Sequence, residues 1–126
     1  MDSKFYVSLE AARLLKEKGY NEKCTFAYTD TSNGSDINGR IVFNSNDYPV
    51  GIYPCPTKAE AIDWLESKGI IIEVFSARIG ENRKWCNSII NTKTYITIET
   101  PYKFSTRLEA EEVAIIKACE FLENGN

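Results

Sequence analysis

Few side chains in this 126-residue sequence could perform acid–base or nucleophilic chemistry. Histidine, the commonest general base near neutral pH, is absent. Glu73 is the one acid within an apolar, strand-like segment, on the same side as Ile71 and Phe75. We expect it to lie at a sheet edge or beside a base such as Arg78. Cys86 has no histidine to activate it as a nucleophile. We therefore predict no catalytic residues and no enzymatic activity.

The four cysteines are isolated in the sequence: Cys24, Cys55, Cys86 and Cys119. Structural zinc sites draw their ligands from close pairs, so we expect buried thiols in a reducing cytoplasm, without a metal. The sequence has no Walker loop, G-x-G-x-x-G or G-x-S-x-G motif. "DTSNGSD" (30–36) lacks the length and final glutamate of an EF-hand, and we expect a polar hairpin loop over 31–39. No cofactor is predicted.

Basic and aromatic side chains gather in the hairpin-like segment 78–95. They are Arg78, Arg83, Lys84, Trp85, Lys93 and Tyr95. Such a group can hold single-stranded nucleic acid by charge and stacking, form a protein-interaction face, or be a solvated sheet face with cross-strand pairs. The 15 basic and 18 acidic residues give a net charge of −3, which argues against a dedicated nucleic-acid binder.

Three segments have the caps and the periodicity of helices. They run from Leu9 to Lys18, from Thr57 to Gly69, and from Thr106 to about Glu123. Ser8 can cap the first, and Gly19 ends it. The second and third each open with T-x-x-E, the sequence of a capping box.

Between the helices, β-branched and aromatic residues recur with period two. The predicted strands are 24–30, 40–44, 49–53, 70–79, 84–90 and 94–99. Short turns at 80–82 and 91–93 should pair the last three as antiparallel hairpins. Because each helix has one apolar stripe, the order α-β-β(-β)-α-β-β-β-α predicts an α+β fold, an antiparallel β-sheet covered by helices.

The length fits a single compact domain over residues 1–126. Within it, Glu10-Ala11 and Lys18-Gly19 match Glu60-Ala61 and Lys68-Gly69 fifty positions later. Well-formed helices share caps and stops, which is one explanation of the match. The other is that 1–56 and 57–126 are related halves sharing a core, and both explanations stay open.

Two nucleic-acid-binding folds can be tested against the sequence. "SLEAARLLKEKGY" (8–20) fits the opening of a helix-turn-helix, but β-type sequence follows where the recognition helix should stand. Residues 57–123 are similar in topology to a double-stranded-RNA-binding domain. Their last helix opens with three early glutamates in "RLEAEE" (107–112), which would repel phosphate. We therefore expect a related topology without RNA binding.

Longer stretches carry two resemblances. "YVSLEAARLLKEKGYNEKC" (6–24) and "PTKAEAIDWLESKGIIIEV" (56–74) resemble small uncharacterised proteins of gut bacteria associated with phage or mobile elements. The C-terminal part, with "WLESKG" (64–69), "KWCNSII" (84–90) and "FSTRLEAEEVAIIKACEFL" (104–122), resembles the phage domain named for its helix-sheet-helix (ABA) sandwich. These motifs are structural, so the resemblance implies an origin and a fold, and no functional residue is carried over.

The predicted strand 70–79 has apolar residues on both of its faces. Ile70, Ile72 and Val74 alternate with Ile71 and Phe75. One set should pack on helices, and the other must be covered by the N-terminal half, a second copy or a partner. We therefore predict a non-enzymatic accessory or protein-interaction protein of phage or mobile-element origin. The alternative is weak single-stranded nucleic-acid binding through the 78–95 hairpin.

The expected partner is an unknown protein, with a homodimer included. Apolar runs such as Ile70-Ile71-Ile72 are far too short to cross a bilayer, and the N-terminus lacks the pattern of a signal peptide. We accordingly expect a cytoplasmic protein that does not associate with membranes.

Overall fold

The computed structural model describes residues 3–29 and 40–122, which form three α-helices and six strands. The helices are α1 (Leu9–Glu17), α2 (Lys58–Ser67) and α3 (Arg107–Phe121). The strands are β1 (Cys24–Thr29), β2 (Arg40–Ser45), β3 (Ile52–Pro54), β4 (Ile70–Ile79), β5 (Asn82–Asn91) and β6 (Ile96–Phe104). The predicted α+β class and element order are confirmed, whereas the loop expected at 31–39 lies outside the described residues.

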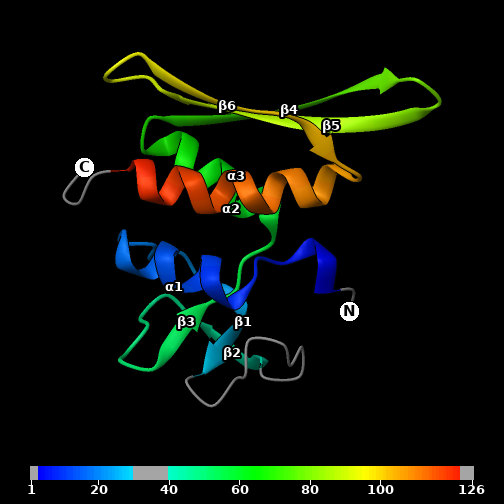
Figure 1. Cartoon of the computed structure of the whole chain (residues 1–126). Helices are drawn as coiled ribbons and strands as arrows, with labels where there is room; N and C mark the ends of the chain where they lie inside the picture. The colour runs from blue at the N-terminus through cyan, green and yellow to red at the C-terminus, as the bar shows by residue number, and fades with distance from the viewer. Residues whose placement is uncertain (1–2, 30–39, 123–126) are drawn as a thin grey trace.

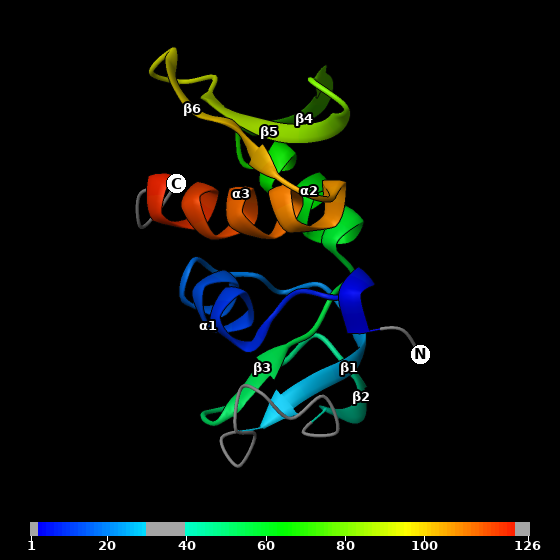
Figure 2. The same ribbon diagram turned by 45° about the vertical axis from the view of Figure 1, so that its right-hand side comes forward.

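The strands divide into two antiparallel sheets rather than the single sheet that the sequence predicted. Their orders are β2-β1-β3 and β4-β5-β6. The three helices lie between the sheets, with α2 and α3 against β4–β6 and α1 against β1–β3 (Figure 1; Figure 2). This layering is stable because α3 is buried on a broad stripe, which lets it pack on a sheet and on another helix at once.

Each helix begins at the cap that the sequence predicted. The Ser8 side chain accepts a hydrogen bond from the first turn of α1. Thr57 and Glu60 form a complete capping box on α2. The Thr106 hydroxyl accepts the backbone N–H of Glu109, at 3.1 Å. These caps satisfy amide groups that would otherwise lack partners, and so they fix where the helices start.

One hydrophobic core connects the two halves of the chain. Leu15 of α1, Leu65 of α2 and Ile115 of α3 are fully buried in it, together with Ile70 of β4 and Ile89 of β5. Residues of both halves therefore share one apolar interior.

A polar contact reinforces the junction of α1 and α3. Glu112 of α3 accepts the backbone N–H of Ser8 at 3.2 Å and the Ser8 hydroxyl at 2.5 Å. The carboxylate therefore lies at the positive N-terminal end of α1, where the helix dipole favours an anion. This contact ties the C-terminal helix to the N-terminal one.

Strand β6 begins two residues later and ends five residues later than the predicted strand 94–99. The sequence prediction stopped before Pro101, which cannot donate a ladder hydrogen bond. The structure accommodates Pro101 because β6 is an edge strand of its sheet. Tyr95, expected at the start of this strand, instead belongs to the preceding turn and has a φ of 62°.

Candidate functional site

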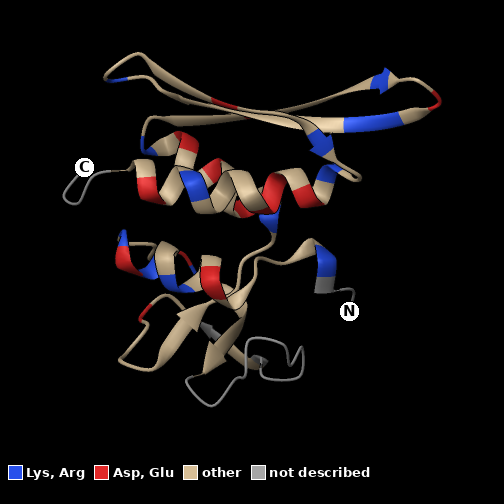
Figure 3. Ribbon diagram, viewed as in Figure 1, with Lys and Arg blue, Asp and Glu red and all other residues tan. Residues whose placement is uncertain are grey.

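The six basic and aromatic residues predicted as an interaction face separate into two groups. Arg78, Arg83, Lys84 and Trp85 lie at the β4–β5 end of the sheet, whereas Lys93 and Tyr95 lie in the turn between β5 and β6. Figure 3 shows basic residues along the β4–β5 end. Trp85 and Lys93 are eight positions apart, mostly along the extended strand β5, a span of roughly 25 Å. The six residues therefore do not form one patch.

At the β4–β5 end, the side chains make mostly local contacts. Arg78 and Arg83 stand directly opposite each other, and the Arg83 guanidinium donates to the Ser76 hydroxyl at 2.7 Å. Trp85 is half-buried, between Ser76 of β4 and Phe104 of β6. The indole is thus partly used in packing and presents less surface for stacking than the sequence suggested.

At the other end, the β5–β6 turn holds an exposed aromatic ring. Asn91 organises this turn, because its side-chain oxygen accepts the backbone N–H groups of Lys93 and Thr94. Tyr95 follows in the left-handed region, with 86% of its surface exposed. A non-glycine residue in that region is uncommon and strained. The turn therefore presents Tyr95 at some cost in stability.

Between these two ends, alternate residues of the sheet face the helices. The Asn87 side-chain nitrogen donates to the carbonyl of Ala110 in α3, at 3.0 Å. Lys117 of α3 donates to the Thr100 hydroxyl at 2.6 Å. Since Asn87 and Thr100 are opposite each other, they mark the helix-facing side of β5 and β6. Their sequence neighbours accordingly point to the opposite side.

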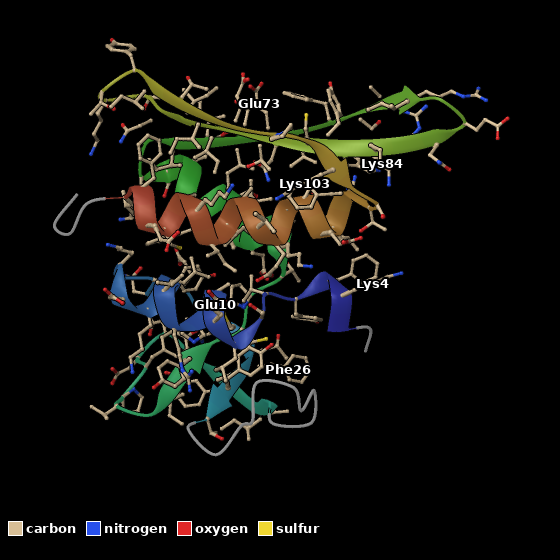
Figure 4. The ribbon with its side chains drawn as sticks, in the orientation of Figure 1. Lys4, Glu10, Phe26, Glu73, Lys84 and Lys103 are labelled. Atoms are coloured by element: carbon tan, nitrogen blue, oxygen red, sulfur yellow. The ribbon has the colours of Figure 1, made fainter. Side chains whose placement is uncertain are left out.

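We call this opposite side the outer face, and its central residues are Glu73, Phe75, Cys86, Ser88, Glu99 and Tyr102. The strand register places Phe75 opposite Cys86, and Ser88 between Glu73 and Glu99. The register confirms that Glu73 shares a face with Phe75, and Figure 4 shows Glu73 pointing away from the helices. No element among residues 3–29 and 40–122 covers this face (Figure 2). The N-terminal half, one of the three predicted covers, packs elsewhere.

The outer face is hollowed over β5. Cys86 and Ser88 are only 5% and 4% exposed, although no helix lies over them. They are small, and the larger side chains of β4 and β6 rise on either side. A pocket of about 510 Å³ opens here, with Phe75, Glu99 and Tyr102 among its walls. Its size falls within the range of small-ligand sites, roughly 300–1,000 Å³.

Pro101 explains why the hollow forms at this point. Thr100 pairs with Asn87 and Phe104 pairs with Trp85, so residues 101–103 all lie opposite Cys86. This irregularity interrupts the β5–β6 ladder at Cys86, because a bulge inserts extra residues and proline removes a ladder hydrogen bond. The end of β6 turns toward the start of α3 (Figure 1), and the hollow lies over the Cys86 thiol, where the ladder is interrupted.

The hollow combines aromatic walls with negative charge. The Cys86 side chain lies beside Tyr102 in the pocket, and its proximity raises the pKa of the Tyr102 hydroxyl. Glu99 is exposed at the rim, and no lysine or arginine is among the residues that line the pocket. A site of this kind suits a cation with an apolar stem, because aromatic faces and carboxylates both attract positive charge.

A second pocket, of about 430 Å³, lies between the N-terminal segment and the start of α3. Two of its charged residues already have structural partners. Lys58 is 7% exposed and donates to the carbonyl of Leu108, and Glu112 binds Ser8. Its polar groups are therefore less available to a ligand than those of the outer face.

The cysteines behave as buried thiols. All four lie within the described residues, are buried and form no disulfide, as predicted. Burial raises the pKa of Cys119 to about 12, and it also raises the pKa of Cys24. A thiol with a raised pKa is mostly protonated at neutral pH and is a poor nucleophile.

Residues 3–29 and 40–122 hold no group of three or more acidic or cysteine side chains that could bind a metal ion. None of the helices in that part of the chain is both long and apolar enough to cross a membrane.

The sequence prediction missed Pro101 and Tyr102 as parts of a site. It ended the last strand at residue 99, and it considered Glu73 and Cys86 only as catalytic candidates. The signal that could have found the site is that small residues of β5 pair with large residues of β4 and β6. This signal can be used only when the strand register is known. Comparison of the chain with protein-family models, with curated proteins and with solved structures found no match.

Proposed function

We propose that this chain is a non-enzymatic protein-interaction protein, and that it binds its partner through the outer face of the β4-β5-β6 sheet. One observation carries the proposal: this face is uncovered, yet it exposes large apolar side chains at its centre and its end. Phe75, Ile79 and Tyr102 are 43%, 50% and 42% exposed. Large exposed apolar side chains on one uncovered sheet face are typical of an interaction site. An origin in phage or mobile elements rests on the sequence resemblance alone.

Binding agrees better than catalysis with the chemistry of the site. The pocket has a thiol, a phenol and a carboxylate, and the carboxylate lies exposed at the rim. A general acid or base is normally activated by burial or by a neighbouring charge, and a nucleophilic thiol by an adjacent base. The aromatic walls and the exposed apolar side chains around them are features of a recognition surface.

Single-stranded nucleic acid is less well supported as the ligand. The cations Arg78 and Arg83 stand at the β4–β5 end, whereas the most exposed aromatic ring of the predicted group, Tyr95, stands at the other. Stacking and charge should act on neighbouring nucleotides, so the two groups would need to be adjacent. The outer face between them carries Glu73 and Glu99, which repel phosphate.

The test compares two serine variants of the immobilised protein. Phe75→Ser with Tyr102→Ser removes the aromatic walls, and Val50→Ser changes a residue that is 98% exposed elsewhere. Two properties are measured: which proteins are captured from a bacterial lysate, and the molecular mass from sedimentation. Both should change for Phe75→Ser with Tyr102→Ser and stay the same for Val50→Ser. Capture and mass that stay identical in all three proteins would contradict the proposal.

A second experiment measures whether a fluorescent single-stranded oligonucleotide binds the protein. The proposal expects no salt-sensitive binding even at low ionic strength. Binding that is lost on Arg78→Ala with Arg83→Ala would favour the nucleic-acid alternative over a protein partner.

A further inference from the structure

The outer face offers two kinds of side chain in adjacent rows. One row crosses the sheet as Phe75, Cys86 and, from the bulged part of β6, Tyr102. The next row crosses it as Glu73, Ser88 and Glu99. In each row a small buried residue of β5 separates two larger residues of the edge strands. The rows therefore form one trough along β5, aromatic at one end and acidic at the other.

The dimensions of a sheet set the distances within this trough. Neighbouring strands are about 4.8 Å apart, and residues two positions apart on one face are about 6.7 Å apart. A group lying over Cys86 is therefore about 5 Å to the side of the strand that carries Phe75, and Tyr102, which lines the same pocket, stands on its other side. A charge over Ser88 is similarly placed between the Glu73 and Glu99 carboxylates.

We infer that the trough receives an arginine side chain of a partner protein, with the methylene stem between the two aromatic rings and the guanidinium between the two carboxylates. This inference rests on the proposed function and names the chemistry of the partner. Arginine fits better than lysine because its planar, multiply donating head can bind two carboxylates at once. The exposed residues around the trough favour a protein over a free amine, since Phe75 and Ile79 continue the apolar surface beyond it.

The charge of the surroundings agrees with this occupant. Glu73 and Glu99 are both exposed, so they keep their charge accessible to a partner. Ser88 between them is a hydroxyl that can accept a hydrogen bond from the guanidinium. An anionic or purely aliphatic residue would leave these carboxylates facing each other without a counter-charge.

The test uses N-acetyl-arginine amide as the probe, with N-acetyl-citrulline amide as its neutral analogue of the same shape. Backbone amide resonances are followed while each probe is added to the full-length protein. We expect saturable shifts for residues 86–88 and 99–102 with the arginine probe, at a Kd in the millimolar range, and none with citrulline. Equal shifts with both probes, or none at these residues, would overturn the inference.

Charge-removing variants locate the binding groups. Glu99→Gln and Glu73→Gln should each weaken binding about three- to tenfold, as expected for loss of one charged hydrogen bond at an open site. Glu81→Gln, in the β4–β5 turn, removes the same charge from an exposed position outside the trough and should leave the Kd unchanged. The glutamine variants are expected to fold, because all three side chains are exposed. A double Glu73→Gln, Glu99→Gln variant that binds like the wild type would refute the arginine site.

The failure of this inference can be separated from failure of the proposed function. If the double glutamine variant still captures the partner that Phe75→Ser with Tyr102→Ser loses, the outer face is the interface and the arginine is not its occupant. If neither variant affects capture or mass, both proposals fail. If the double glutamine variant instead dissociates a dimer of this chain, a second copy occupies the trough and the inference of a different partner is wrong.

Discussion

The two faces of the β4-β5-β6 sheet use the same central strand in opposite ways. On the helix-facing side, β5 contributes Asn87 and Ile89, which α3 and the core bury almost completely. On the outer side it contributes Cys86 and Ser88, which are just as inaccessible although no element lies above them. On the helix-facing side, the β5 side chains are therefore buried by another layer. On the outer side, they are buried by the larger side chains of β4 and β6 beside them.

This difference separates stability from recognition. Removing a buried group from the helix-facing side leaves a cavity or an unsatisfied polar group within a close-packed interior. Removing a group from the outer side changes the shape of a surface that water already reaches. Side chains of the outer face can therefore vary with little effect on folding, which leaves them available to bind a partner.

Thiol alkylation should give the largest contrast. Cys119 is fully buried in the core, whereas Cys86 lines the pocket on the outer face. Iodoacetamide can reach Cys86 after small movements of Phe75 or Tyr102, but it reaches Cys119 only when the core opens. We expect Cys86 to react roughly 10³-fold faster, the lower end of the folding equilibrium constants of small domains. Peptide mass spectrometry over a time course gives both rates.

Two controls make the alkylation result interpretable. In denaturant the two thiols should react at similar rates, which would show that folding causes the difference. A partner or arginine probe bound over the trough should slow the reaction of Cys86 and leave that of Cys119 unchanged. Equal rates in the folded protein would mean that the trough does not open to a small reagent.

Truncation of apolar residues should separate the faces by stability. Ile89→Ala removes a fully buried side chain on the helix-facing side and should lower the free energy of unfolding by about 2–5 kcal/mol. Phe75→Ala, at a residue 43% exposed on the outer face, should cost no more than about 1.5 kcal/mol. Urea denaturation followed by circular dichroism measures both. A larger loss for Phe75 would show that the outer face belongs to the folding core.

Adjacent polar residues provide a finer version of the same comparison. Asn87→Ala removes the hydrogen bond to the Ala110 carbonyl, and we expect it to destabilise the fold by about 1–2 kcal/mol. Ser88→Ala, the next residue on the other face, should cost less, because no helix or strand of the described residues packs above its side chain. Denaturation under identical conditions measures the difference. Similar losses in the two variants would contradict the assignment of the faces.

The sequence was sufficient for the local parts of this architecture. Ser8, Thr57 and Thr106 predicted the helix starts because capping depends on residues within one turn. Alternation along 70–79 placed Glu73 and Phe75 on one face correctly, since side chains alternate strictly in a strand. The division into two sheets was missed because it depends on which side of the helices the N-terminal strands pack.

The candidate site was less predictable because it depends on register. Glu73 and Glu99 are 26 positions apart, and only the pairing of both with Ser88 places them in one row. The bulge after Thr100 offsets the remaining residues of β6, so strict alternation from residue 96 would assign Tyr102 to the wrong face. Arg78, Arg83, Lys84, Trp85, Lys93 and Tyr95 were grouped by closeness in the sequence. Most of the length of β5, a strand of ten residues, lies between the two groups.

The smallest expected effect is a gain in stability at the end of the sheet, where neither face is packed. Tyr95 has a φ of 62° and a ring that is 86% exposed. Asparagine tolerates this conformation better, so Tyr95→Asn should stabilise the fold by about 0.5–1 kcal/mol in thermal or urea unfolding. Tyr102→Asn, which relieves no such strain, should not stabilise it. A stabilised Tyr95 variant would indicate that the tyrosine is kept for contact rather than for folding, whereas a destabilised one would show that its ring packs against the turn.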